Sequence, residues 1–382
     1  MTPKHKDTQE GPISQSEFHR YVREQLRGAV RVALTAILEE ELTAFIGAGP
    51  YEQKATRRDH RNGHYERNLG TSFGEIEGLA VPRSRGGFQT QVFERYHRRQ
   101  TELDAAILGM YVGGNSTQQV GVVVESLTGS HPSPATVSRV YHTLEAEYTS
   151  WKQRPLAAHY RYAFADGTYF SVIYEQEGVK MPVLAVVGIT PTGEREVLGF
   201  TTGDRENQTA WEDLLADFKQ RGLAQVDLWI TDGNQAMLNA IALKFPTAQR
   251  QRCVIHKMNN VLSYIPKQHH DKVEAELKAI FYQESRSQAD KLLAAFCAKY
   301  ENSYPTAVEC LRRDQEACLT FYSFPKAHWK TIRTNNVAER LFEEVKKRYH
   351  KMNAAFPNEN SCLLLFFAVV RSLKFKRLSM PA

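Results

Sequence analysis

Apolar residues recur at three- and four-residue steps between Ser16 and Ile46, a spacing that predicts one long amphipathic helix. Gly47 and Pro50 are expected to end this helix. Its apolar stripe has two interpretations of equal weight. In the first, the stripe packs against a partner helix or a second copy of the chain. In the second, the helix is an ordinary element of its domain.

Two shorter helical patterns lie within 116–144. Ser116 is a suitable N-cap for the first, Gly129 interrupts the pattern, and Ser133 with Pro134 suits the start of the second. Helix, short turn and helix is the order of a helix-turn-helix motif. The same pattern describes any small helical pair, so these residues alone leave both interpretations open. The second helix would present Thr136, Ser138, Arg139 and His142.

Beyond Pro155 the pattern changes to strands rich in aromatic and β-branched residues. The predicted elements are strands at 162–174, 180–190 and 194–202, a helix at 207–221, a strand at 226–232 and a helix through Leu243. Three strands, helix, strand and helix is the order of an RNase H-like α/β sheet. In such a sheet the first and fourth strands are neighbours and run parallel.

The remaining chain is mostly helical in pattern. Residues 257–324 show short amphipathic repeats, which we interpret as a helical insertion between the sheet and the residues that complete the site. A last amphipathic helix is expected after Thr334. The apolar run from Cys362 to Val370 is about half the length of a membrane span, so we expect a buried core helix there.

Composition narrows the class of protein. A chain of 382 residues is long enough for two or three domains, and 42% hydrophobic residues exclude wholesale disorder. Five cysteines, an odd and scattered set, do not form a disulfide framework and suit a reducing cytoplasm. The polar residues 1–16 contain no signal-peptide pattern. We therefore expect a soluble cytoplasmic protein without a membrane partner.

Positive charge is modest in total, at a net +6, but uneven along the chain. Residues 54–100 contain ten Lys and Arg against five Asp and Glu, with aromatic residues interleaved. Basic residues on Gly-rich loops suit DNA phosphates, although a solvated basic surface gives the same pattern. The candidate DNA-binding residues are Arg57, Arg58, Arg61, Arg83, Arg85, Arg139, Arg340, Lys346, Lys347 and Arg348.

Two Asp-Gly pairs carry the candidate chemistry. Asp166-Gly167 interrupts a predicted strand, and locally this pair favours a β-turn or bulge. Asp232-Gly233 follows the fourth strand, where α/β sheets place functional groups, although a turn or helix cap explains it equally well. If the two strands are neighbours, both carboxylates lie close enough to share a divalent cation, which would relieve their repulsion.

Glu339 has two candidate roles. Asn336 as N-cap with Glu339 three residues later resembles a capping box, while a helix start facing the sheet would direct Glu339 towards the metal. Cys253 and His256 have the spacing of half a zinc site, but no second pair with suitable spacing follows closely. We favour a structural cysteine and a histidine that hydrogen-bonds the wall of the site.

Taken together, these residues resemble the bacterial Mutator-type insertion-sequence transposases along nearly the whole chain. The resemblance rests on the order and spacing of short motifs: 61–63, 81–83, 166–167, 221–223, 232–233, 245–246, 251–256, 334–340 and 356–361. It implies an acidic triad of Asp166, Asp232 and Glu339 that binds two Mg²⁺ ions, with Mn²⁺ as a substitute. The family's Cys-x-x-His signature falls on Cys253 and His256.

The resemblance also implies the activity and the partners. The expected protein binds the terminal inverted repeats of its insertion sequence and catalyses metal-dependent DNA cleavage and strand transfer, as a homodimer or larger assembly. Thr334-Asn335 and Lys346–Arg348 depart from the commonest family pattern without touching the triad. Two alternatives are an RNase H-like nuclease without strand transfer and a catalytically silent DNA-binding regulator.

The expected fold is thus an α/β RNase H-like catalytic core with an all-α insertion, preceded by a mainly helical DNA-binding region. Its segments would be an N-terminal helical region (1–50), a DNA-binding region with a basic β/loop segment and the helix-turn-helix (51–154), the first part of the core (155–256), the insertion (257–330) and the C-terminal core helices (331–382).

Overall fold

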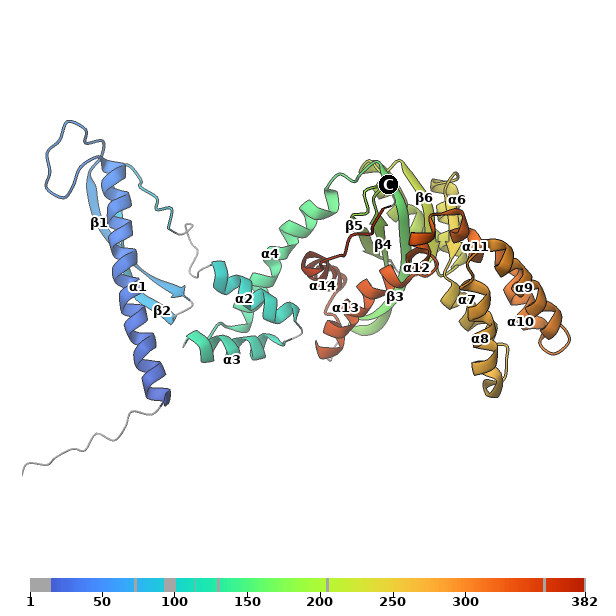
Figure 1. The fold of residues 1–382 in the computed structure, drawn as a ribbon. Helices are drawn as coiled ribbons and strands as arrows, with labels where there is room; N and C mark the ends of the chain where they lie inside the picture. The colour runs from blue at the N-terminus through green and yellow to red at the C-terminus, as the bar shows by residue number, and fades with distance from the viewer. Residues whose placement is uncertain are drawn as a thin grey trace, which may run out of the picture. The chain divides into compact units, whose positions relative to one another are not determined.

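The computed structural model describes residues 15–71, 74–92, 101–113, 115–128, 131–203, 206–352 and 355–380. The chain divides into two compact units, residues 1–143 and 144–382 (Figure 1). The polar segment before residue 15 and the predicted turn residue Gly129 lie outside the described ranges. Among the residues described, no helix combines the length and the apolar character needed to cross a membrane.

The first unit is built on the long helix that the apolar spacing predicted. Helix α1 runs from Gln15 to Ile46 and ends where Gly47 adopts a φ of 77°, a conformation that favours glycine. It packs on an antiparallel hairpin of β1 (Arg61–Thr71) and β2 (Gly74–Ser84) (Figure 1). Their shared core contains Leu38, Leu69, Ile76, Leu79 and Val81.

Three further helices follow, α2 (Thr101–Val112), α3 (Thr117–Thr128) and α4 (Pro134–Gln153). Both predicted caps are present: the Ser116 hydroxyl accepts a hydrogen bond from the Gln119 N–H, and the Ser133 hydroxyl accepts one from the Thr136 N–H. Helix α4 continues nine residues beyond the predicted end at 144 and reaches Gln153. Their core contains Leu103, Ile107, Val120, Val124, Val137 and Val140.

The second unit contains a five-stranded sheet in the order β5-β4-β3-β6-β7. The strands are β3 (His159–Tyr174), β4 (Glu177–Ile189), β5 (Arg195–Thr202), β6 (Gln225–Thr231) and β7 (Gln249–Arg252). Strands β3, β4 and β5 form the predicted antiparallel meander, and β6 runs parallel to β3 as its neighbour, as expected. Strand β7 was not predicted, because its four residues are all polar and show no apolar alternation.

Helices cover both faces of this sheet (Figure 1). On one face, Trp211 of α5 (Gln208–Gln220) and Ile241 of α6 (Gln235–Lys244) pack into the same core as Ala163 and Ala165 of β3. On the other face, α13 (Asn336–Met352) and α14 (Glu359–Ser372) contact the alternate residues of β3. Rings from these two helices, those of Tyr349 and Phe366, meet Phe170 edge-on.

Between β7 and α13 the chain forms a helical segment with its own core. Its helices are α7 (Val254–Leu262), α8 (His270–Phe281), α9 (Arg286–Tyr300), α10 (Pro305–Arg313), α11 (Gln315–Leu319) and α12 (Trp329–Ile332), with short 3₁₀ turns at 267–269, 320–323 and 326–328. The buried Gln251 of β7 ties this segment to the sheet, because it accepts a hydrogen bond from the Phe321 N–H (2.7 Å) and donates one to the Cys318 carbonyl (2.8 Å).

Candidate active site

Asp166 lies in an unbroken part of strand β3. It pairs with Ala185 of β4 and Gly167 pairs with Leu184, with no register shift between the two strands. The interpretation of Asp166-Gly167 as a turn or bulge is therefore wrong. Local preference for a turn is overridden because β3 is held between two neighbouring strands.

Asp232 follows the last residue of β6, next to the same stretch of β3. The parallel register pairs Phe164 with Ile230, so Asp166 and Asp232 each come two residues later on neighbouring strands. The Asp232 carboxylate accepts a hydrogen bond from the Asn234 N–H (2.9 Å), and Gly233 has a φ of 89°. Asp232 thus starts a turn and also lies beside Asp166, and its role as a cation ligand stays a prediction.

Glu339 lies in the first turn of α13, and the capping box predicted there is wrong. The helix begins at Asn336, so the capping position belongs to Asn335, whose carbonyl oxygen accepts the Glu339 N–H (3.1 Å). Asn335 is fully buried, and its amide donates to the carbonyl of Ala165, next to Asp166 (2.9 Å). Its own N–H donates to the Cys253 sulfur (3.3 Å). These contacts hold the Glu339 helix against the Asp166 strand.

Burial and the charges of neighbouring carboxylates act on Asp166 and Glu339. Burial, and after it the charge of Asp232, raises the pKa of Asp166 to about 7, with further contributions from Glu339 and Glu206 against an opposing hydrogen bond from the Gly167 N–H. Burial also raises the pKa of Glu339, although His256 opposes this effect. Each group would hold its charge more easily beside a cation.

Cys253 and His256 lie next to Glu339. Cys253 precedes α7 and is buried, and the His256 Nδ1 is 3.7 Å from a carboxylate oxygen of Glu339. Cys253, His256 and Glu339 form the one group within the described ranges that offers three metal-ligating atoms within 4.8 Å of one another. Burial raises the pKa of the Cys253 thiol, and its sulfur accepts the Asn335 N–H. The structural role of Cys253 stays a prediction.

Glu206 is a further acidic residue at this site, and sequence reasoning missed it. It precedes Asn207, the N-cap of α5, and its carboxylate accepts a hydrogen bond from the Asn234 side chain (3.0 Å). Burial, and after it the charge of Asp232, raises the pKa of Glu206. The sequence offered one weak signal, an acidic residue in the loop that leaves the predicted meander.

Several of the predicted DNA-binding arginines form contacts within the first unit. Arg57 donates to the carbonyls of Glu52 and Asp59 (both 3.1 Å) and Arg58 donates to that of Ala44 (3.2 Å). Arg61, which lies in β1 rather than in a loop, pairs with Glu39 at 2.5 Å. The side chain of Arg83, in β2 rather than a loop, donates to the His64 carbonyl (2.9 Å) and lies over the Tyr65 ring.

The other candidate basic residues divide into two groups. Lys347 and Arg348 pair with Glu344 on the same helix, at 2.7 and 3.0 Å. Arg85, Arg139, Arg340 and Lys346 have no side-chain hydrogen bond or ion pair with any residue in the described part of the chain. This second group therefore keeps its charges available for an external anion.

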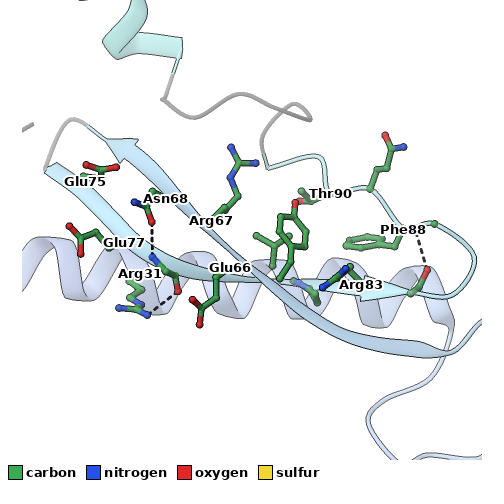
Figure 2. Close-up of a pocket in the computed structure, with 16 residues that line it drawn as sticks. Arg31, Glu66, Arg67, Asn68, Glu75, Glu77, Arg83, Phe88 and Thr90 are labelled. Atoms are coloured by element: carbon green, nitrogen blue, oxygen red, sulfur yellow. Dashed lines mark hydrogen bonds between the residues drawn. The ribbon is translucent and has the colours of Figure 1, made fainter. Parts of the chain in front are cut away.

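A hollow of about 1300 Å³ lies on the hairpin of the first unit (Figure 2). Arginines and glutamates line it together, and Arg31 donates to the Gly78 carbonyl at its rim. The mixed charge does not favour an anion or a cation. Its labelled lining residues are Arg31, Glu66, Arg67, Asn68, Glu75, Glu77, Arg83, Phe88 and Thr90.

Acidic side chains at matched positions of two parallel strands, with a third on a covering helix, are typical of enzymes that transfer phosphoryl groups with divalent cations. Comparison with known proteins identifies the family. Residues 1–377 match the sequence model described as "Transposase, Mutator family". This chain belongs to the Mutator family of transposases and is a DNA transposase.

Its curated relatives are insertion-sequence transposases, and the chain matches them over most of their length. The transposase for ISRM5 of Rhizobium meliloti is 35% identical over 90% of this chain and 86% of its own length. The transposase for IS905 of Lactococcus lactis is 31% identical over 93% of this chain and 90% of its own length. Among solved structures, the Mos1 transposase paired-end complex with left transposon end is 12% identical with a TM-score of 0.17, and covers 62% of this chain and 83% of that one.

Proposed function

We propose that this transposase binds the terminal inverted repeats of its insertion sequence and performs DNA cleavage and strand transfer at Asp166, Asp232 and Glu339, on an RNase H-like core with a helical insertion. One observation carries the proposal: the register of β3 and β6 places Asp166 and Asp232 at matched positions. Asn335 then links the helix of Glu339 to the same strand.

The donor set fits hard divalent cations. Carboxylate oxygens are the ligands that Mg²⁺ prefers, and neither Asp166 nor Asp232 forms an ion pair with a Lys or Arg in the part of the chain that the structure describes. Two bound Mg²⁺ or Mn²⁺ ions would stabilise charge on the attacking and leaving oxygens of the DNA phosphate. Asp166, Asp232 and Glu339 would hold these ions.

The protein's own residues set the conditions for this chemistry. Asp166, with a pKa of about 7, must release its proton before it can bind a cation, so cation affinity should increase with pH. The contacts of Asn335 hold the start of the Glu339 helix against strand β3.

DNA contact is assigned to the available basic residues and to the α3–α4 pair, interpreted as a helix-turn-helix. Arg85 and Arg139 belong to the first unit, while Arg340 and Lys346 lie on the helix that carries Glu339. These four charges suit phosphates of end or target DNA. Because two element ends must be held together, we expect a dimer or larger assembly, acting in the bacterial cytoplasm.

Joining of pre-cut element ends to plain target DNA in Mg²⁺ tests the proposal. Asp166→Asn should abolish joining while end binding persists, because the amide keeps the shape of the side chain but loses its charge. Asp213→Asn, at an exposed position of α5, is the matched control and should join normally. Wild-type joining by Asp166→Asn would refute the assignment. Cleavage without joining by the wild-type protein would favour a nuclease, and end binding alone would favour a silent regulator.

A further inference from the structure

We propose that Glu206 is a fourth carboxylate ligand of the divalent-cation site, held in place by Asn234. The inference rests on the proposed function, since it concerns the cations of that same site. It adds a residue to Asp166, Asp232 and Glu339 from a different part of the chain, the loop between β5 and α5.

The first observation is the space that the Glu206 carboxylate occupies. A Cβ added to Gly167 would lie 2.9 Å from one Glu206 oxygen and 3.2 Å from the other, closer than side chains normally approach. Glu206 therefore fills the position that a side chain next to Asp166 would take. A side chain at position 167 would have to displace that carboxylate.

The second observation is the fixed position of Asn234. Its side-chain oxygen caps α6 by accepting the N–H groups of Ala236 (2.9 Å) and Met237 (3.3 Å). Its side-chain amide donates to Glu206 (3.0 Å), and its backbone N–H donates to Asp232 (2.9 Å). One residue, anchored by a helix cap, thus orients both carboxylates.

The third observation is direction. Along β3, Ala163 and Ala165 pack with α5 and α6, and Gly167 continues that alternation, so Glu206 approaches from this face. Asp166 alternates with them and is directed towards the face covered by α13, which carries Glu339. The two glutamates therefore reach the aspartates from opposite faces of the sheet.

The fourth observation is charge. Glu206 forms no ion pair with a Lys, Arg or His among the residues that the structure describes, and its polar neighbours there, the Asn234 amide and the Trp211 indole, are neutral. It lies close enough to Asp166 and Asp232 for their charges to interact. A half-buried carboxylate with neutral neighbours gains from a cation that it shares with Asp166 and Asp232.

Mn²⁺ binding to the full-length protein, followed by the paramagnetic resonance of free Mn²⁺, tests the inference without relying on activity. Glu206→Gln should weaken the binding about tenfold or more, a loss typical of residues that ligate or directly support a metal. Glu212→Gln, on the exposed side of α5, is the matched control and should bind like wild type. A melting temperature within about 2 °C of wild type would show that Glu206→Gln folds normally.

The inference and the proposed function can fail separately. Wild-type Mn²⁺ affinity in Glu206→Gln, with affinity lost in Asp166→Asn, overturns the role of Glu206 alone. Full affinity in both variants overturns the proposed cation site as well.

Asn234→Ser gives a second, independent measurement. Serine keeps a cap for α6 but is too short to reach Glu206, so it should weaken Mn²⁺ binding in the wild-type background. In the Glu206→Gln background it should cost little more, because the two residues act through one contact. Wild-type binding by Asn234→Ser, or fully additive losses, would contradict the positioning of Glu206 by Asn234.

Discussion

The contact between Asn335 and strand β3 allows a sharp test of how Glu339 is positioned. Asn335→Ala removes the hydrogen bond from the Asn335 amide to the Ala165 carbonyl. Both residues are buried. Losing such a bond and leaving its acceptor without that partner costs about 1–3 kcal/mol. For a unit of this size, that loss corresponds to a decrease in melting temperature of about 2–12 °C.

Strand transfer should fall even at temperatures where the variant is fully folded, because the contact aligns α13 with Asp166. Joining of pre-cut ends, measured well below the melting temperature of the variant, should fall at least tenfold. Asn335→Asp should be worse, since a carboxylate would face the Ala165 carbonyl.

The neighbouring Asn336 supplies the matched control. It is exposed at the first position of α13, so Asn336→Ala should leave both melting and joining close to wild type. A capping box predicts the reverse order, with a loss of about 1 kcal/mol at Asn336 and little effect at Asn335. Wild-type behaviour of Asn335→Ala, or greater damage from Asn336→Ala, would refute the positioning role.

This pair of residues also shows what the sequence could and could not provide. The amphipathic pattern located the last helix and the strands of the meander, because burial on one face leaves a regular apolar spacing. It misplaced the start of α13 by one residue, since two adjacent asparagines are equally good caps on local grounds. Only the sheet beside them decides which one is buried.

At the acidic site, too, the local sequence pattern predicted some features and tertiary contacts decided the others. Asp232 was predictable because a short apolar strand ends directly before it. The local signal at Asp166 favoured a turn, and its place in a continuous strand depends on pairing with both β4 and β6. Glu206 has only a weak local signal, an acidic residue in the loop after the meander. Its position becomes meaningful only through its contacts with Gly167 and Asn234, which are distant in the sequence.

Charge composition was the weakest guide. The basic segment of the first unit was predicted to contact DNA, and this stays a prediction. Arg57, Arg58 and Arg61 also donate to the backbone or to Glu39. Arginines that stabilise loops and arginines that bind phosphates have the same composition in the sequence. Only the contacts that each arginine makes in the folded chain distinguish the two kinds.

Three further predictions follow from particular contacts. Because the pKa of Asp166 is raised, the folded protein keeps a proton on Asp166 that the unfolded chain releases. The stability of the metal-free protein should therefore fall as pH rises from about 4 to about 7. Thermal melts of Asp166→Asn should show a smaller fall. Gln251→Leu should lower the melting temperature because the buried Phe321 N–H loses its acceptor, with exposed Gln249→Leu as control. Arg139→Ala should weaken end binding and reduce its salt slope by about 1, whereas Arg58→Ala should leave the slope unchanged.

The central claim is that Asp232 contributes an oxygen ligand to a catalytic divalent cation. Asp232→Cys replaces that oxygen with sulfur, which Mn²⁺ accepts more readily than Mg²⁺. Strand transfer by this variant, measured in each metal beside the wild-type protein, tests the claim most directly. We predict loss of joining in Mg²⁺ with partial recovery in Mn²⁺. Wild-type joining in Mg²⁺ would contradict the assignment of Asp232 as a metal ligand.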